Sequence, residues 1–332
     1  MERPPAHAAI THVDSGTGRH EARKEVSLNT ITIAHLSDPH LPTEMVPPRV
    51  GERLNKRMFS YFSWKGRRRH LHRPEILAKV MADIATCPVS MIAVTGDLTN
   101  MGLPGECRQA RRWLEQMPAP CTVIPGNHDT LVYDRWPQTL GLWQPWMGPL
   151  PFPFVRRVGN VALIGVSSAV PTPWFMATGT VGTRQATRLR DILRDTGRQG
   201  LCRIVMIHHP PVSGLAIRRK ALTDIQDFDS CIAAEGAEMI LHGHTHTSTL
   251  SSLPGRMGPV PVVGIASASA RSCDPLRAAG WNRISVTPHD AGYSLHVVRR
   301  FFMADATTGT GQETIFDLPS PSQCGSGVST PA

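Results

Sequence analysis

The feature that most constrains this chain is a short apolar run that stops at a glycine and a carboxylate. Met91–Thr95 is typical of a buried strand, and Gly96 and Asp97 follow it directly. The same plan recurs four more times: a strand pattern ends, and Asp, Asn or His comes next. In open α/β sheets the carboxyl ends of strands carry the functional site. The repetition therefore predicts that distant loops meet at one edge of a sheet.

Strand and helix patterns alternate along most of the chain, which favours a largely parallel sheet. Strand patterns occupy 30–36, 91–95, 121–124, 161–166, 203–207, 239–241, 260–265, 282–286 and 294–301. Helical patterns occupy 74–85, 104–117, 184–195 and 225–234. The last three or four strands follow one another without a helix, so a second sheet or an antiparallel edge is expected. The predicted fold class is α/β, an αββα two-sheet sandwich.

Length and spacing favour one catalytic domain. The chain has 332 residues, and its motifs lie between residues 31 and 246 without a long linker. We expect the domain to span 29–302. Residues 1–28 and 303–332 are rich in small and polar residues and are expected to be disordered.

Composition narrows the partners and the compartment. The net charge of +9 favours anionic partners such as phosphates, nucleic acid or membrane surfaces. Seven cysteines without a Cys-x-x-Cys pair suit buried thiols in a reducing compartment. No apolar run reaches the length of about 18 residues that a spanning helix needs, and the N-terminus lacks the apolar core of a signal peptide. A cytoplasmic protein is therefore expected.

Two segments depart from the alternating plan. The insertion at 42–73 interleaves Phe59, Tyr61, Phe62 and Trp64 with eight Lys or Arg between Arg53 and Arg73. It could contact anionic lipid at the inner membrane face through residues 51–73, stack on a nucleotide or single strand, or form a solvated flap whose aromatics pack on the domain. The apolar segment at 133–176 could cap the site and hold a base or acyl chain, or simply pack over the sheet.

The first strand end carries Asp38-Pro39-His40. Residues two apart in an extended chain project from one face, so Asp38 and His40 can bind one ion together. Pro39 also favours an extended backbone at Asp38. His35 lies within the strand pattern and is expected to be structural.

Two later strand ends supply amide and imidazole groups. In Gly126-Asn127-His128-Asp129, the Asn127 side chain offers a neutral carbonyl oxygen, and His128 can reach the same cavity without being a ligand. In His208-His209 we favour His208 as a metal ligand because it continues directly from the strand. His209 is expected to lie behind it or to contact substrate.

The last of these strand ends carries three histidines. His244 and His246 repeat the spacing of Asp38 and His40, so both are expected to bind metal. His242 is expected to be structural, and Gly243 allows a sharp change of direction after it.

Together the strand ends predict seven metal ligands: Asp38, His40, Asp97, Asn127, His208, His244 and His246. This set of nitrogen and oxygen donors lacks a thiolate and suits Mn, Fe, Zn or Co. Seven ligands are too many for one ion, so they divide into two sites that share Asp97.

The order of these motifs resembles the calcineurin-like metallophosphoesterase superfamily over about residues 31–300. The motifs are Asp-x-His, Gly-Asp-x-x-Asn, Gly-Asn-His-Asp, His-His-Pro and Gly-His-Thr-His. The resemblance implies an αββα sandwich and two metal ions, one held by Asp38, His40 and His246, the other by Asn127, His208 and His244, with Asp97 bridging. His128 matches the histidine that contacts phosphate and assists the leaving group.

The resemblance implies a phosphodiesterase or phosphatase in which a hydroxide between the metals attacks phosphorus, with Asp97 and His128 as catalytic residues. The chain is similar to bacterial class III cyclic-nucleotide phosphodiesterases, so cyclic nucleotides are the leading expected substrate. The alternatives are a membrane-associated pyrophosphatase of a nucleotide-linked lipid and a catalytically silent scaffold that binds a partner through its basic flap. A nuclease is disfavoured because no DNA-capping domain is evident.

Overall fold

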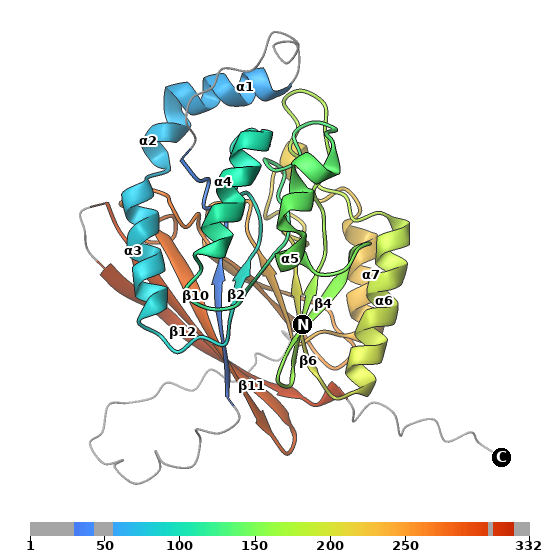
Figure 1. Cartoon of the computed structure of the whole chain (residues 1–332). Helices are drawn as coiled ribbons and strands as arrows, with labels where there is room; N and C mark the ends of the chain where they lie inside the picture. The colour runs from blue at the N-terminus through green and yellow to red at the C-terminus, as the bar shows by residue number, and fades with distance from the viewer. Residues whose placement is uncertain (1–29, 43–55, 305–307, 322–332) are drawn as a thin grey trace, which may run out of the picture.

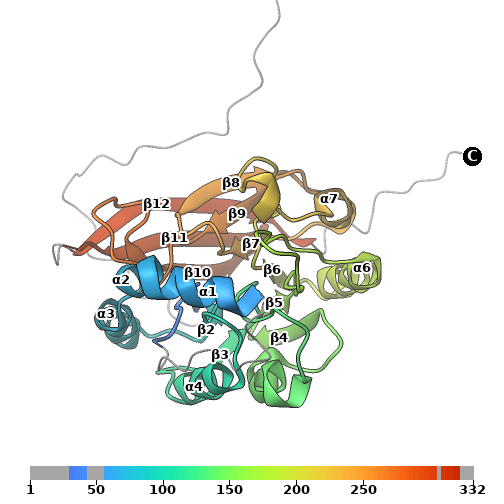
Figure 2. The same cartoon turned by 90° about the horizontal axis from the view of Figure 1, so that it is seen from above.

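Two six-stranded sheets form the centre of the computed structural model, which describes residues 30–42, 56–304 and 308–321 (Figure 1). The first sheet has the order β12-β11-β10-β1-β2-β3, and the second has the order β4-β5-β6-β7-β9-β8. Helices cover the outside of both sheets (Figures 1 and 2). The predicted αββα sandwich is therefore confirmed.

The first sheet combines a parallel part with an antiparallel edge. Its strands are β1 (Ile31–Leu36), β2 (Met91–Val94), β3 (Cys121–Val123), β10 (Ala279–His289), β11 (Gly292–Phe302) and β12 (Thr308–Pro319). β1, β2 and β3 are parallel, whereas β10 pairs antiparallel with β1 and is followed by β11 and β12. This is the antiparallel edge expected from the consecutive strands.

The second sheet is parallel at its centre. Its strands are β4 (Phe154–Val158), β5 (Val161–Gly165), β6 (Cys202–Met206), β7 (Met239–His242), β8 (Thr249–Leu253) and β9 (Val260–Gly264). β5, β6, β7 and β9 are parallel, and the antiparallel strands β4 and β8 lie at the edges. Strands buried on both faces favour apolar residues at successive positions, which explains the apolar run of β5 and of residues 204–206 in β6; Arg203 at the start of β6 is the exception.

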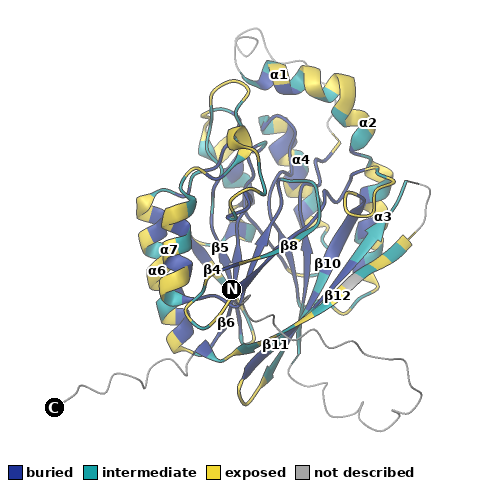
Figure 3. Cartoon of the chain, turned by 180° about the vertical axis from the view of Figure 1, so that it is seen from behind, coloured by how far each residue is buried: buried dark blue, intermediate teal, exposed yellow. Residues whose placement is uncertain are grey.

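Two apolar cores follow from the alternation of side chains along these strands. Leu163 and Ile204 face the core between the sheets, whereas Ile164 and Val205 face the core beneath α6 (Thr183–Arg198) and α7 (Ile225–Glu235). The helices α3 (Pro74–Ala85) and α4 (Pro104–Glu115) pack on the first sheet and begin at proline. Figure 3 shows the buried strands between helices whose outer faces are exposed.

The region between residues 56 and 73 lies at the end of the sandwich toward which β1 points (Figure 1). It contains α1 (Lys56–Ser63), a π-helix (Trp64–Arg68) and α2 (Arg69–Leu71). Shorter helical turns elsewhere are Trp136–Gln138, Leu140–Trp143, α5 (Gln144–Met147) and Arg218–Lys220. None of the helices in the described part of the chain has the length and apolar composition needed to cross a bilayer.

The structure corrects the expectation that residues 303–332 are a disordered tail. Thr308–Pro319 form β12, which pairs along β11. An edge strand is stabilised by backbone pairing on one side and buries few side chains, so its sequence can be small and polar. The expected disordered segment 1–28 lies outside the described residues, as do residues 322–332 and the start of the insertion, 43–55.

The aromatic residues of segment 133–176 divide into two groups. Trp143 is fully buried, and Trp136 and Trp146 pack against the core between the sheets, as expected for chain that packs over the fold. Trp174 and Phe175 are exposed instead, and their rings lie 4.8 and 5.0 Å from the ring of Phe59 in α1. This second group lies beside the described part of the insertion.

Candidate metal centre

The loops after β1, β2, β3, β6 and β7 meet beneath α1 and α2, which lie across the strand ends (Figure 2). Backbone hydrogen bonds continue the pairing of β1 and β2 into the loops: Asp38 N donates to Gly96 O at 2.9 Å, and His40 N donates to Asp97 O at 3.1 Å. Two of the five motif segments are therefore fixed to each other by main-chain contacts.

Left-handed backbone marks most of the expected ligands. Positive φ angles of 52, 38, 56, 67 and 52° occur at Asp38, His40, Asp97, His244 and His246. Such values are uncommon outside glycine and are strained by roughly 1–3 kcal/mol each. The expectation that Asp38 and His40 project from an extended chain was wrong. A left-handed turn at each of these five residues directs its side chain into the site. The Asp38 carboxylate is also fixed by a hydrogen bond, because its Oδ2 accepts the backbone N–H of His244 at 3.0 Å.

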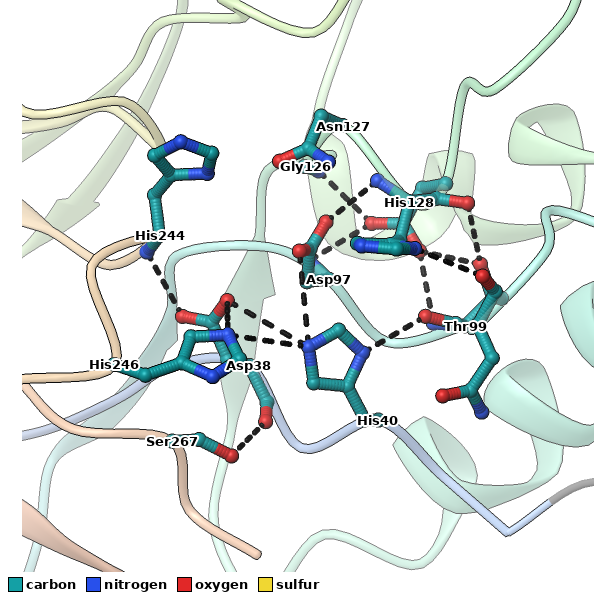
Figure 4. A network of polar contacts seen from close by, with 12 residues as sticks. Asp38, His40, Asp97, Thr99, Gly126, Asn127, His128, His244, His246 and Ser267 are labelled. Atoms are coloured by element: carbon teal, nitrogen blue, oxygen red, sulfur yellow. Dashed lines mark hydrogen bonds and ion pairs between the residues drawn. The ribbon is translucent and has the colours of Figure 1, made fainter. Parts of the chain in front are cut away.

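Four of the expected ligands form one tight group. Ligand atoms of Asp38, His40, Asp97 and His246 all lie within 4.8 Å of one another (Figure 4). The Nε2 of His246 is 3.1 Å from Asp38 Oδ1 and 3.4 Å from His40 Nε2. His40 Nε2 is 3.8 Å from Asp97 Oδ2.

The other three expected ligands lie on the far side of Asp97. His208 Nε2 is 3.5 Å from Asp97 Oδ2 and 3.2 Å from Asn127 Oδ1. The His244 ring lies 5.1 Å from the His208 ring, and these two histidines form a group with His209 whose ligand atoms lie within 4.8 Å. Asp97 therefore lies between imidazole nitrogens of both halves of the site.

The donor set fits metal ions because three of its four imidazoles are oriented by a backbone carbonyl. His40 Nδ1 lies 3.1 Å from Thr99 O, His208 Nδ1 lies 2.7 Å from Thr95 O, and His244 Nε2 lies 2.9 Å from Lys220 O. A carbonyl only accepts, so these ring nitrogens donate. The opposite nitrogen of each ring is left for the site, which is how metal-binding histidines are usually positioned.

The charges of the site compensate one another. Burial opposes ionisation of Asp38 and Asp97, but His246 beside Asp38 and His208 beside Asp97 outweigh it and hold the pKa of both carboxyls low. Burial likewise opposes protonation of His208, yet Asp97 raises the pKa of His208 to about 9. Both carboxylates are thus charged at neutral pH and available to cations.

Comparison with known proteins decides the family. A model of the calcineurin-like phosphoesterases matches residues 31–248. The chain belongs to this family. It is a metal-dependent phosphoric ester hydrolase by that membership, and the His and Asp groups at the strand ends suit the two-metal centre of the family.

Individual relatives are distant. A protein of Synechococcus sp. (strain ATCC 27144 / PCC 6301 / SAUG 1402/1) described as "probable cyclic nucleotide phosphodiesterase" is 25% identical over 214 residues, which cover 64% of this chain and 77% of that protein. A dimetal phosphatase from Danio rerio has a similar structure, with a TM-score of 0.53, 11% identity, and coverage of 86% of this chain and 98% of that one. Purple acid phosphatase PPD1 from yellow lupin gives a TM-score of 0.58, 11% identity, and coverage of 86% and 53%. Both phosphatase structures share the fold of this chain.

The other histidines of the motifs serve the fold or the site in different ways. His209 uses both ring nitrogens, toward Ser168 Oγ at 2.8 Å and Ala177 O at 3.2 Å, so it is not free to bind metal without losing a contact. His35 and His242 bind hydroxyl groups of Thr95 and Thr249, as expected of structural residues.

His128 lies beside the Asp97 carboxylate, because its backbone N–H donates to Asp97 Oδ1 at 2.8 Å. Its Nδ1 lies 2.8 Å from Asn100 O, which leaves Nε2 toward the site. Burial, and then the charge of Arg68, lowers the pKa of His128 to about 3. The ring is therefore neutral at pH 7 in this arrangement.

Asp129 organises the loops, although the sequence analysis did not select it as a site residue. Its carboxylate accepts the N–H groups of Asp97, Thr99 and Gly126 at 2.9, 2.9 and 2.8 Å. It thereby ties the loop after β2 to the loop after β3. Its place in the Gly-Asn-His-Asp motif was the available signal.

Arg68 and His72 also enter the site from the insertion. The sequence analysis did not select them, because they lie among many other basic residues. Arg68 Nη1 lies 2.9 Å from His128 Nε2, and Nη2 lies 3.0 Å from His40 Nε2. The buried His72 ring lies 4.3 Å from the His40 ring and 5.4 Å from the His246 ring. No single-residue signal distinguishes Arg68 from the arginines beside it in the sequence.

Proposed function

We propose that this chain hydrolyses phosphodiesters at a two-cation centre, with cyclic nucleotides as the leading substrate. The observation that carries the proposal is the position of Asp97. Its Oδ2 lies 3.8 Å from His40 Nε2 and 3.5 Å from His208 Nε2, so one carboxylate serves both halves of the site. The Synechococcus relative supports the cyclic-nucleotide substrate.

The ligands would divide as the motifs suggest, with Asp97 shared. Asp38, His40 and His246 would hold one cation, and Asn127, His208 and His244 the other. When bound, the two cations supply Lewis-acid activation of water and offset charge on the phosphate. Mn, Fe, Zn or Co suits these donors.

The chain's own residues then position and protonate the substrate. The Asp97 carboxylate fixes the loop of His128 through the His128 N–H. An anionic phosphate beside a histidine favours its charged form, so substrate binding raises the pKa of His128. We assign proton donation to the leaving oxygen to His128 in that substrate-bound state.

A second candidate is a membrane-associated pyrophosphatase of a nucleotide-linked lipid. Exposed aromatic side chains favour it: Phe59 of α1 forms a cluster with Trp174 and Phe175, and Phe62 of the same helix is 63% exposed. Exposed Lys65, Arg67 and Arg69 follow in the same segment. Aromatic and basic residues together suit the surface of an anionic bilayer.

A substrate panel tests these candidates. The protein loaded with Mn²⁺ is assayed on cyclic nucleotides, bis-p-nitrophenyl phosphate, p-nitrophenyl phosphate and a nucleotide-sugar lipid, with chelator and Asp97→Asn as controls. Preference for cyclic nucleotides supports the first candidate, and cleavage of the lipid supports the second. No turnover on any ester, with metal bound, would favour a scaffold instead.

Membrane contact has its own test. Flotation with vesicles of anionic and of neutral phospholipid is compared for the parent protein and for Phe59→Ser/Phe62→Ser. Binding to anionic vesicles that the double variant loses supports the contact. Equal recovery of both proteins contradicts it.

A further inference from the structure

The segment from residue 56 to residue 73, here called the flap, is fastened at its start to the loop after β2 and at its end to the loop after β9. Near its start, Arg57 donates to Met101 O at 3.1 Å and Ser60 Oγ donates to Asn100 O at 2.7 Å. At its end, Arg73 N donates to Ser269 O at 2.8 Å. These bonds hold the flap across the strand ends (Figure 2).

Arg68 is the arginine of the flap that points into the site. Arg67 and Arg69 on either side are exposed, whereas Arg68 is half-buried and its guanidinium lies against His40 and His128. It closes the π-helix Trp64–Arg68. π-Helical segments are rare in proteins, and those that exist are often found at functional sites.

The guanidinium has no carboxylate partner within 4.0 Å among the described residues, although Asp38 and Asp97 lie near enough to favour its charge. Cations held by those two carboxylates would neutralise them and add positive charge on the same side. A half-buried guanidinium then needs another anion. Its planar donors match the paired oxygens of a phosphate.

We propose that Arg68 binds non-bridging oxygens of the substrate phosphate, so that the flap supplies part of the substrate site. This rests on the proposed function for the identity of the substrate, but phosphate binding itself can be measured without turnover. Its position next to His128 places the guanidinium beside the group assigned to the leaving oxygen.

The experiment compares Arg68→Ala and Arg68→Lys with the neighbouring controls Arg67→Ala and Arg69→Ala, all in the full chain loaded with Mn²⁺. Three quantities are measured: metal per chain, the dissociation constant of inorganic phosphate by calorimetry, and kcat and KM on bis-p-nitrophenyl phosphate.

Arg68→Ala should keep its metal, weaken phosphate binding by about 10- to 100-fold and raise KM, because it loses charge-assisted hydrogen bonds. Arg68→Lys should bind phosphate with intermediate affinity, and the controls should stay within about twofold.

Phosphate affinity within about twofold of the parent in metal-loaded Arg68→Ala would overturn the proposal. So would loss of metal in both Arg68 variants, because Arg68 would then support the ligands rather than the substrate. If phosphate binding weakens but no ester is turned over, the proposed function fails while the role of Arg68 stands.

Discussion

Buried charges at the two ends of the parallel strands have different kinds of partner. At the start of β6, Arg203 and the buried Glu238 form a two-pronged ion pair, with Nε to Oε2 at 3.0 Å and Nη2 to Oε1 at 2.8 Å. Arg203 Nη1 also donates to the carbonyls of Glu235 and Leu193. Both charges of this buried pair are thus matched by a permanent partner.

At the other end of the strands, Asp38 and Asp97 are equally buried but face imidazoles and the guanidinium of the flap. Five of the seven expected ligands there have left-handed backbone. One end is built for stability, whereas the other retains charge and strain that bound cations and phosphate can use. Substitutions should therefore separate stability from function according to the end they affect.

The largest functional effect is expected from Asp97→Ala. Loss of the shared carboxylate should remove bound metal and lower turnover by at least about 10³-fold. The metal-free protein should lose less stability than Glu238→Ala, because His208 can release its proton when its carboxylate partner is removed, whereas the guanidinium of Arg203 stays charged. Elemental analysis, turnover and thermal unfolding measure these outcomes. Parent-like metal content would contradict the prediction.

The largest stability effect is expected from Glu238→Ala at the opposite end. It leaves the buried Arg203 guanidinium without its carboxylate and should cost about 3–5 kcal/mol of unfolding free energy. Folded protein should keep its metal content and turnover. Urea unfolding measures the cost. A clear loss of turnover per folded chain would contradict the proposed separation of the two ends.

His128→Ala should separate metal binding from turnover at the functional end. We expect parent-like metal content with turnover lowered by about 10²–10⁴-fold, because the side chain acts on substrate rather than on cations. Metal analysis beside steady-state kinetics tests this. Equal metal loss in His128→Ala and Asp97→Ala would contradict the assignment of His128 to substrate and Asp97 to metal.

Gly126→Ala should disturb the shared carboxylate without altering charge. A Cβ at Gly126 would lie 2.2 Å from Asp97 Oδ1 and 2.6 Å from Asp97 N, so both the carboxylate and its backbone must move. We expect roughly a 10²-fold loss of turnover, as for other displacements near 1 Å. Gly66→Ala is the matched control, because nothing lies within 4 Å of its added Cβ. Parent-like kinetics in Gly126→Ala would show that the site tolerates the shift.

The smallest effect is expected from Asp83→Asn, remote from the site. Burial opposes ionisation of Asp83, but hydrogen bonds from Arg300 and Trp281 outweigh it and lower the pKa of Asp83. A lowered pKa stabilises the fold at neutral pH, and this contribution is lost as the pH falls through the folded-state pKa. The variant should lose roughly 0.5–1.5 kcal/mol at pH 7 and show a weaker acid dependence. Urea unfolding at pH 7 and pH 3 checks both, and an unchanged pH dependence would contradict the assignment.

Local pattern in the sequence was sufficient for the inner strands, the four long helices and the order of the motifs. The apolar run Met91–Thr95 identifies a buried strand from its own residues. The helix that starts at Pro74 is identified by its proline and its apolar periodicity. Neither prediction needs information about distant residues. The seven expected ligands followed from the same local signal. The structure places all of them at one end of the sandwich.

Contacts between residues far apart in the chain decided the rest. β12 has weak local signal and exists because β11 pairs with it. The inward turns of Asp38 and His246, the bonds from Asp129 and the entry of Arg68 over His40 and His128 all depend on how the two sheets and the flap pack together. Sequence periodicity records the environment along one element, whereas these features are fixed by partners on other elements.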